Sequence, residues 1–258
     1  MRKTAIAKAV VLAAAFGAMS SAMAVEVTAN ANLTTDYKFR GISQTNRGAA
    51  FQGGFDADFG NGFYLGNWNS NVNFAGTGPV TSSGSNGLET DIYGGYRGEF
   101  KGVGYDLGGL YYYYERATTD TNGKKLNTFE LYGKASYMNA YAKVSYAASE
   151  NYFGLISSTG TKPDLRGSLY YDLGYTYPVT DKFSLTGHYG HTTYDKSIAN
   201  GFAAGTNKSY DDYSLTGAYT VGKYTFSLAY VDTNSKAQDL FGKTLTKGTL
   251  IATVGTTF

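Results

Sequence analysis

Residues 25–36 read VEVTANANLTTD, and their side chains alternate strictly between two faces. One face carries Val25, Val27, Ala29, Ala31, Leu33 and Thr35, and the other carries Glu26, Thr28, Asn30, Asn32, Thr34 and Asp36. A period of two is typical of a β-strand whose faces meet different surroundings. Glycine and tyrosine recur too often in the rest of the chain for stable helices. The stretch therefore predicts a strand.

The same alternation recurs to the end of the chain in runs of about ten residues, the length that a tilted strand needs to cross a bilayer. The runs predict strands near residues 25–37, 50–59, 63–72, 88–100, 105–115, 127–137, 140–147, 165–177, 183–192, 211–221, 224–232 and 248–258.

Short and long connections alternate between these runs. The short ones are 60–62, 101–104, 138–139, 178–182 and 222–223, and the long ones lie near 38–49, 73–87, 116–126, 148–164, 193–210 and 233–247. Hairpins with short turns at one end and long loops at the other are typical of bacterial outer-membrane barrels. We therefore expect an all-β, antiparallel up-and-down transmembrane barrel of about twelve strands, with both termini on the periplasmic side.

Alternation alone also fits a soluble β-sandwich, whose apolar face would point inward. Two features argue against that alternative. The polar face is rich in Thr, Ser, Asn, Gly and Tyr and poor in Lys and Glu, unlike an ordinary soluble surface. Aromatic residues also gather beside the short turns, as expected for a periplasmic girdle at the membrane interface. The predicted girdle consists of Phe59, Phe63, Phe100, Tyr105, Tyr137, Tyr177, Phe183, Tyr224 and Phe258.

The first 24 residues have the order of a secretory signal peptide. Arg2, Lys3 and Lys8 precede an apolar run over residues 9–19, and Ala22-Met23-Ala24 forms a small-x-small cleavage site. The run is shorter than the ~20 residues of a membrane-spanning helix. We therefore expect cleavage after Ala24, leaving residues 25–258 as an outer-membrane β-barrel in a Gram-negative bacterium.

Composition supports this class. The whole chain carries 22 basic and 20 acidic residues, and loss of the three basic residues of 1–24 leaves a net charge near −1. No basic field for nucleic acid remains. The charged fraction is 16%, below the ~25% of soluble domains. The mean hydropathy is −0.29 and there is no cysteine, so neither apolar helices nor disulfides account for stability.

Several stretches resemble one family. The longest covers Leu33 to Val72, LTTDYKFRGISQTNRGAAFQGGFDADFGNGFYLGNWNSNV, and ETDIYGGYRGEF, YDLGGLYYYYE and YDLGYTYPVTDKFSLTGHYGH follow from Glu89, Tyr105 and Tyr171. In these stretches the chain resembles the TorF-type, Gcw_chp-like porins of proteobacterial outer membranes. The resemblance covers nearly all of residues 25–258 and implies a barrel and a pore. It implies no particular substrate.

If the apolar face meets lipid, the polar face lines the barrel interior. The predicted pore-lining residues are Glu89, Asp91, Arg97, Glu99, Asp106, Glu130, Lys134, Lys143, Arg166 and Asp172, together with Tyr112, Tyr132 and Tyr170. Neighbouring opposite charges either pair and brace the wall or form a transverse field that selects solutes by charge. The excess of two acidic residues predicts a mild cation preference.

The loop after the first strand carries Lys38, Arg40 and Arg47 in a segment punctuated by glycine. It either folds inward as a constriction or lies over the extracellular rim, and surface loops favour the rim. Inward tyrosines similarly either narrow the channel or plug it. Twelve strands enclose more room than eight, whose interior side chains fill the barrel, and less than an open porin of sixteen.

An enzyme is the remaining alternative. Nucleophilic hydrolysis needs a base beside a serine, and the chain offers His188, expected to face inward with Ser184 and Thr186, and His191, expected to face lipid. Neither lies in a recognisable serine motif. Asp211 and Asp212 are adjacent, so their side chains point to opposite faces. No spacing predicts a metal or a cofactor.

We therefore expect a non-enzymatic channel for passive diffusion of small hydrophilic solutes. A plugged structural barrel without flux is the first alternative and an outer-membrane hydrolase is the second. The expected partners are membrane lipid, the solutes, and the barrel-assembly machinery through the C-terminal strand that ends in Phe258. A homo-oligomer remains open, because a subunit contact on the lipid face is as apolar as a lipid contact.

Overall fold

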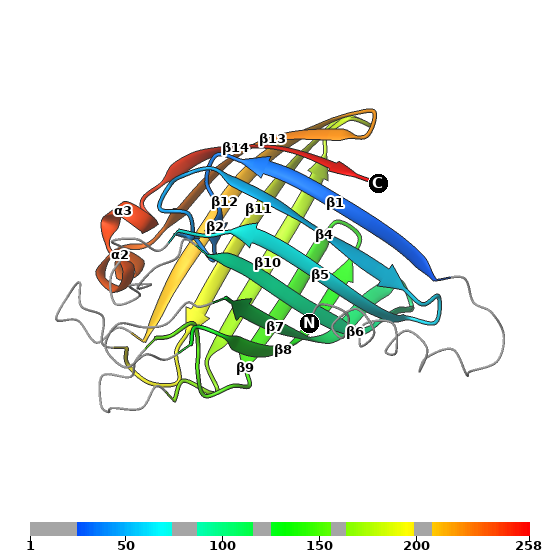
Figure 1. Ribbon diagram of the computed structural model, residues 1–258. Helices are drawn as coiled ribbons and strands as arrows, with labels where there is room; N and C mark the ends of the chain where they lie inside the picture. The colour runs from blue at the N-terminus through cyan, green and yellow to red at the C-terminus, as the bar shows by residue number, and fades with distance from the viewer. Residues whose placement is uncertain (1–24, 74–86, 116–124, 156–163, 199–207) are drawn as a thin grey trace, which may run out of the picture.

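Twelve long strands close into one antiparallel barrel in the computed structural model, which describes residues 25–73, 87–115, 125–155, 164–198 and 208–258 (Figure 1). The strands are β1 (Glu26–Thr34), β4 (Ala50–Asp58), β5 (Phe63–Asn71), β6 (Leu88–Phe100), β7 (Val103–Tyr114), β8 (Thr128–Tyr137), β9 (Ala140–Ala147), β10 (Leu169–Pro178), β11 (Phe183–Thr193), β12 (Ser209–Val221), β13 (Tyr224–Thr233) and β14 (Thr249–Thr257). The predicted fold and strand number are confirmed. The predicted signal peptide lies outside the described residues.

The first and last strands close the ring. Asn30 of β1 is opposite Gly54 of β4 on one side and Thr257 of β14 on the other. All other neighbours in the ring follow one another in the chain as antiparallel pairs. Closure leaves no unpaired sheet edge, which is how a β-structure satisfies its backbone groups within lipid.

The two ends of the barrel differ in their connections. Five short turns join β4–β5, β6–β7, β8–β9, β10–β11 and β12–β13 at one end, where β1 begins and β14 ends. The described parts of the long connections and two short helices lie at the other end (Figure 1). We call these the short-turn end and the long-loop end.

The outward face is apolar along its middle and aromatic toward both ends. Exposed aliphatic side chains form the middle belt: Leu65, Ile92, Leu107, Leu131, Val144, Leu173, Leu215 and Leu228. The predicted girdle residues lie at the short-turn end. A second aromatic ring, missed in the sequence, lies toward the long-loop end: Phe51, Tyr111, Tyr113, Phe129, Tyr146, Tyr171, Tyr189, Tyr213 and Tyr230. An aliphatic belt between two aromatic rings is the lipid-facing pattern of membrane barrels.

The long-loop end contains short elements that the alternation did not predict. They are β2 (Lys38–Phe39), β3 (Ile42–Ser43), α2 (Ser235–Phe241) and α3 (Lys243–Thr246). Asn234 caps α2, since its side chain accepts a hydrogen bond from the Ala237 amide. No helix in the described residues is both long and apolar enough to span a membrane.

Hydrophobic side chains from these loops fill the long-loop end. One cluster joins Ile42, Ala147, Tyr152, Leu155, Leu165, Tyr194, Ile198, Tyr210, Ala237, Leu240 and Leu245. A second joins Val72, Tyr112, Tyr114 and Leu126, with Tyr37, Phe39, Leu110 and Phe153 packed against it. Because inward tyrosines of the strands take part, this apolar core covers the barrel interior.

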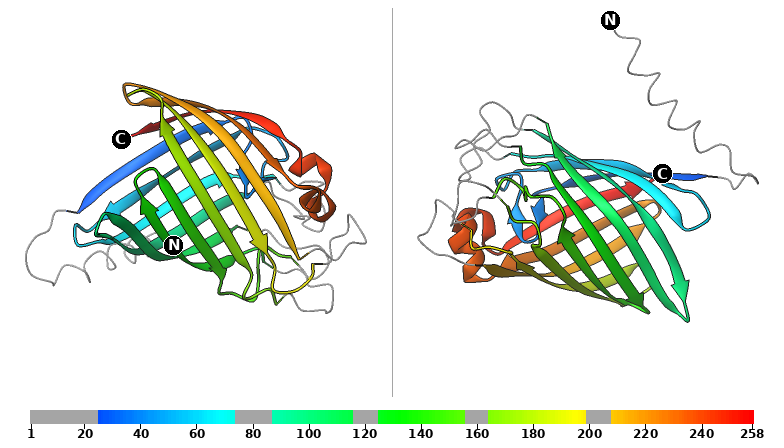
Figure 2. Two further views of the ribbon diagram at one scale, coloured as in Figure 1. Left: turned by 180° about the vertical axis from the view of Figure 1, so that it is seen from behind. Right: turned by 90° about the horizontal axis from the view of Figure 1, so that it is seen from below.

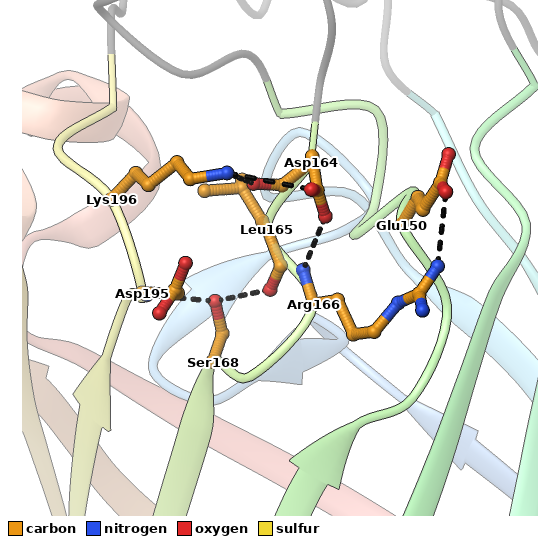
Figure 3. Close-up of polar contacts among 7 residues, drawn as sticks. All are labelled: Glu150, Asp164, Leu165, Arg166, Ser168, Asp195 and Lys196. Atoms are coloured by element: carbon orange, nitrogen blue, oxygen red, sulfur yellow. Dashed lines mark hydrogen bonds and ion pairs between the residues drawn. The ribbon is translucent and has the colours of Figure 1, made fainter.

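The prediction for Arg166 was wrong. β10 begins at Leu169, so Arg166 lies in the preceding loop, where its exposed guanidinium binds Glu150 at 3.0 Å instead of lining the interior (Figure 3). Leu165, expected to face lipid, is fully buried in the loop core. Ser168 donates a hydrogen bond to the Leu165 carbonyl at 2.7 Å and turns the chain into the strand. The alternating pattern extends from β10 back into this loop, where the apolar residues pack into the loop core and not against lipid. The pattern therefore placed the start of the strand too early.

Candidate channel interior and constriction hairpin

The loop between β1 and β4 folds into the barrel as a small hairpin. β2 and β3 pair as Lys38↔Ser43 and Phe39↔Ile42, and Figure 2 shows this blue segment between the walls at the long-loop end. Arg40 and Gly41 form its two-residue turn with φ of 49° and 78°. Two positive φ values give a type I′ turn, in which arginine is strained relative to asparagine or glycine. We call residues 38–43 the constriction hairpin.

Arg40 anchors the hairpin to the opposite wall. Its Nη2 lies 2.9 and 2.8 Å from the two carboxylate oxygens of Glu130 on β8, and Nη1 donates to the Tyr152 hydroxyl. Its guanidinium lies 4.2 Å from the centroid of the Tyr170 ring, within range of a cation–π contact. The Arg40 and Glu130 side chains are only 6% and 2% exposed.

The Arg40 guanidinium stays protonated although it is buried. Burial opposes the charged form, but Glu130 and the phenol oxygens of Tyr152 and Tyr112 outweigh it and raise the pKa of the Arg40 guanidinium above its ordinary value. Breaking a buried ion pair by removing one partner costs about 3–5 kcal/mol, because the other charge remains buried without compensation. The Arg40–Glu130 pair therefore holds the hairpin tip firmly against β8.

Aromatic contacts hold the rest of the hairpin. Phe39 packs edge-on against Tyr112 and Phe153, with ring centroids 5.5 and 5.3 Å apart. Tyr37 packs against Trp68 at 5.3 Å and donates a hydrogen bond to Glu89 at 3.1 Å. These contacts tie the hairpin and the residue before it to strands β5, β6 and β7 and to the loop after β9.

Glycine is required at the turn. A Cβ at Gly41 would lie 2.7 Å from the Asp212 Cβ and would overlap the Thr233 side chain. The hairpin tip therefore approaches β12 and β13 as closely as it approaches β8. It extends across the interior from one wall toward the other.

Exposure of inward side chains changes along the barrel. Near the long-loop end Glu89, Glu130 and Asp212 are all at most 2% exposed. Near the short-turn end Arg97 and Glu99 are exposed. The interior is therefore open to solvent at the short-turn end and closed where the hairpin and loop core lie.

The charged residues of the middle strands form one row in register. The row runs Arg97↔Asp106↔Lys134↔Lys143↔Asp172 from β6 to β10. These predicted inward charges are therefore neighbours across adjacent strands. Among the ion pairs of the described residues, however, none joins two members of the row, since Arg97 pairs with Asp58 at 2.5 Å and Asp172 with His188 at 3.1 Å.

Four inward tyrosines lie flat on the wall because each is opposite a glycine. The cross-strand pairs are Tyr64↔Gly95, Tyr93↔Gly66, Tyr132↔Gly108 and Tyr141↔Gly174. A Cβ at each of these glycines would collide with the tyrosine that lies over it. The absent side chain therefore gives the ring room to lie along the wall instead of projecting across the interior.

Each flat tyrosine donates its hydroxyl or shares it with a neighbour. Tyr64 donates to Asp106 at 2.6 Å and also bonds the Tyr132 hydroxyl. Tyr93 donates to Asp56 at 2.7 Å. Tyr141 donates to Asp172 at 2.9 Å.

Cations of the chain cover three of the four rings. Arg97 lies 5.0 Å from the centroid of Tyr64, Lys143 lies 4.2 Å from that of Tyr132, and Lys134 lies 4.7 Å from that of Tyr141. These distances are typical of cation–π contacts.

The interior is more acidic than the sequence indicated. On the described strands the inward acidic residues are Glu26, Asp56, Asp58, Glu89, Asp91, Glu99, Asp106, Glu130, Asp172 and Asp212, and the inward basic ones are Arg97, Lys134 and Lys143. Glu26, Asp56, Asp58 and Asp212 were not among the predicted pore-lining residues. The alternation of their strands was visible in the sequence. Assigning the polar face of every strand to the interior would therefore have added these four residues to the predicted pore-lining set.

The predicted site residues divide into three groups. Arg97, Glu99, Asp106, Tyr132, Lys134, Lys143 and Asp172 lie on the inward face of the more open part, whereas Glu89, Asp91, Tyr112, Glu130 and Tyr170 lie inward beneath the loops. In the loop after β1, Arg40 faces the interior and Arg47 is exposed. The favoured rim position was wrong for Arg40, because Glu130 binds it inside the barrel. That these residues line a conducting pore remains a prediction.

His188 faces the interior and His191 faces outward, as the alternation predicted. His188 contacts Asp172, Asp212 at 3.7 Å and the Tyr170 hydroxyl at 3.3 Å, so the polar partners found for it in the described part of the chain include no serine. His191 binds Asp211 at 2.6 Å on the outer face. No group of three or more His, Cys, Asp or Glu residues suited to a metal is found within the described ranges.

Residues 18–258 match a family model described as "Bacterial protein of unknown function (Gcw_chp)". The chain belongs to the Gcw_chp family. The Gcw_chp-like resemblance is therefore confirmed, whereas the narrower TorF-type assignment remains a prediction. A search of curated proteins finds no match.

Solved structures of other proteins are similar to this Gcw_chp protein. The NanC porin is 11% identical with a TM-score of 0.52, and the match covers 90% of this chain and 99% of NanC. The KdgM porin in complex with disordered oligogalacturonate is 8% identical with a TM-score of 0.48, over 90% and 97% of the two chains. LpxR from Salmonella typhimurium is 11% identical with a TM-score of 0.47, over 90% and 99%. At this identity the likeness to NanC shows the fold of an outer-membrane porin and not its solute.

Proposed function

We propose that this Gcw_chp protein is a non-enzymatic outer-membrane channel for small hydrophilic solutes, which the constriction hairpin closes at the long-loop end. The observation that carries the proposal is the contrast between the two halves of the interior. A charged, solvent-exposed wall at the short-turn end leads to a hairpin whose tip binds the opposite wall through the buried Arg40–Glu130 pair.

Two features favour a channel over a purely structural barrel. The flat tyrosines keep aromatic bulk against the wall, which leaves room in the middle of the interior. Inward carboxylates also outnumber inward basic groups. A permanently closed plug would be more stable if each buried carboxylate had a basic partner, so the excess of carboxylates favours a channel. A permanent plug without flux is the second candidate, because the buried loop core favours it.

Orientation, location and assembly form part of the proposal. The short turns and both termini would face the periplasm, and residues 1–24 would be removed on export through the periplasm. The C-terminal strand β14, with Phe258 after it, would present the chain to the barrel-assembly machinery. The aliphatic belt between aromatic rings supports contact with outer-membrane lipid.

The interior charge predicts cation selectivity. Under a KCl gradient across a planar bilayer, we expect the refolded protein to give a reversal potential of the sign for K⁺ passage. Replacing Asp58, Glu99 and Asp106 together by their amides should move that potential toward zero, because they lie in the more open half. The preference should also decline as salt rises, since ions screen the wall charges.

The matched control is Asp211→Asn, which removes a carboxylate from the outer face. It should leave the reversal potential unchanged. An anion-selective wild type, or an equal effect of the inner and outer substitutions, would contradict the assignment of the interior face.

A further inference from the structure

Tyr93 differs from the other three flat tyrosines of the wall. Tyr64, Tyr132 and Tyr141 each have an arginine or lysine of the chain near the ring. Tyr93 lies over Gly66 and donates to Asp56 in the same manner, but no cation is found over its ring in the described part of the chain. The protein thus repeats an element that holds a cation and leaves one copy without it.

The surroundings of Tyr93 carry acidic groups that no basic side chain pairs with in the described part of the chain. Asp91 is two residues away on the same inward face and only 7% exposed, and its Oδ1 has no hydrogen-bond partner among the described residues. Neither Asp56 nor Asp91 takes part in an ion pair within the described ranges. A buried carboxylate without a partner is costly, and a positively charged group beside it removes part of that cost.

The inward basic residues of the chain are held elsewhere. Arg97 pairs with Asp58, and Arg40 pairs with Glu130. Lys134 and Lys143 lie on β8 and β9 against Tyr141 and Tyr132. Around Tyr93, the wall of β4 to β6 therefore presents an aromatic ring without a cation and two carboxylates, Asp56 and Asp91, without an ion-pair partner in the described residues.

We propose that Tyr93, Asp56 and Asp91 bind the ammonium or guanidinium group of a small organic cation. The ring face supplies a cation–π contact, and the carboxylates accept charge-assisted hydrogen bonds. The site rests on the proposed channel function in one respect, since the channel would bring the solute to it. A site of this kind would make small organic cations the class of solute that the channel favours.

The single tryptophan of the chain reports on this site. Trp68 of β5 is the register partner of Asp91 and lies on the inward face. We expect butylguanidinium, added to the refolded full chain in detergent at low salt, to change Trp68 fluorescence saturably. Butylurea has nearly the same shape without the charge and should produce no such change. Raised salt should weaken the binding of butylguanidinium.

Asp91→Asn and Asp56→Asn should each weaken butylguanidinium binding by about tenfold or more, as expected for loss of a hydrogen bond to a charged group. Asp172→Asn is the matched control, because it removes an inward carboxylate that already binds His188 and Tyr141. It should change binding by less than about twofold. Tyr93→Leu tests the ring without altering charge and serves if an aspartate variant fails to fold, as judged by heat-dependent gel migration.

A saturable response that these variants lose and the control keeps would establish the site. An equal response to butylurea, no response at low salt, or equal weakening by Asp172→Asn would overturn it. Because fluorescence needs no ion flow, binding by a barrel that stays silent in a bilayer would support the site and reject the channel. Conductance without saturable binding of butylguanidinium would support the channel and reject the site.

Discussion

Replacing Arg40 by alanine is expected to open the long-loop end and raise solute flux by about tenfold or more. The variant leaves Glu130 buried without its partner, at a cost of about 3–5 kcal/mol to the closed arrangement. A change of that size lowers the ratio of closed to open states by more than about a hundredfold, so the hairpin should leave the interior far more often than in the wild type. Swelling of liposomes in a small neutral sugar measures the flux directly.

Two further variants separate anchoring from a general effect on the loop. Arg47→Ala removes an exposed arginine seven residues further along the same loop and should leave swelling at the wild-type rate. Arg40→Lys keeps the charge but loses the two-oxygen contact with Glu130, so it should give an intermediate rate. Equal swelling by the wild type and Arg40→Ala would show that the hairpin does not limit passage.

Replacing Gly174 by valine is expected to narrow the channel and destabilise the barrel together. The new side chain would occupy the space of the Tyr141 ring, which then has to leave the wall. Tyr141 would lose its bond to Asp172 and its contact with Lys134, and its ring would project into the interior. We expect a loss of about 1–3 kcal/mol in the free energy of unfolding, as for overpacked cores. In an Arg40→Ala background, conductance should fall.

The chain offers a control for this substitution. Gly187 on β11 faces outward, and a Cβ there would meet nothing within 4 Å. Gly187→Val should therefore leave conductance unchanged. Adding Tyr141→Ala to Gly174→Val should restore conductance by removing the displaced ring. If both glycine variants behave alike, the flat tyrosines do not determine the width of the channel.

The strands could be predicted from the sequence because each one separates lipid from the interior. That separation imposes a period of two on every strand, and most charges of the strands, such as that of Glu89, fall on the inward face. The same rule failed at residues 165–168. There the apolar Leu165 faces the loop core instead of lipid, and a period of two cannot distinguish the two apolar environments.

The constriction hairpin was harder to predict. Its strands are two residues long, so they leave no measurable alternation. Gly41 after Arg40 is the one local sign of a type I′ turn, and such a turn more often begins with asparagine. The decisive contact joins Arg40 to Glu130, 90 positions apart, and nothing in a single sequence pairs these two residues. The Gly–Tyr pairs depend in the same way on cross-strand register.

Tyr112 and Tyr170 were predicted together with Tyr132 to line the pore, and the fold shows why these two do not lie on an open wall. All three face inward, but Tyr112 and Tyr170 are 3% and 7% exposed beneath the loops. Tyr132 lies deeper in the barrel, over Gly108. Facing inward is a property of the strand, whereas exposure depends on what the loops cover.

Single-channel recording of the refolded protein, with and without the constriction hairpin, tests directly whether this barrel is a channel that the hairpin closes. Residues 38–43 are replaced by a short Gly-Ser linker in the second form, and both forms are recorded under the same salt gradient. We expect small or rare conductance steps in the wild type and larger, frequent, cation-selective steps once the hairpin is removed. Silence of both folded forms, or equal conductance in the two, would contradict a channel that is closed by this hairpin.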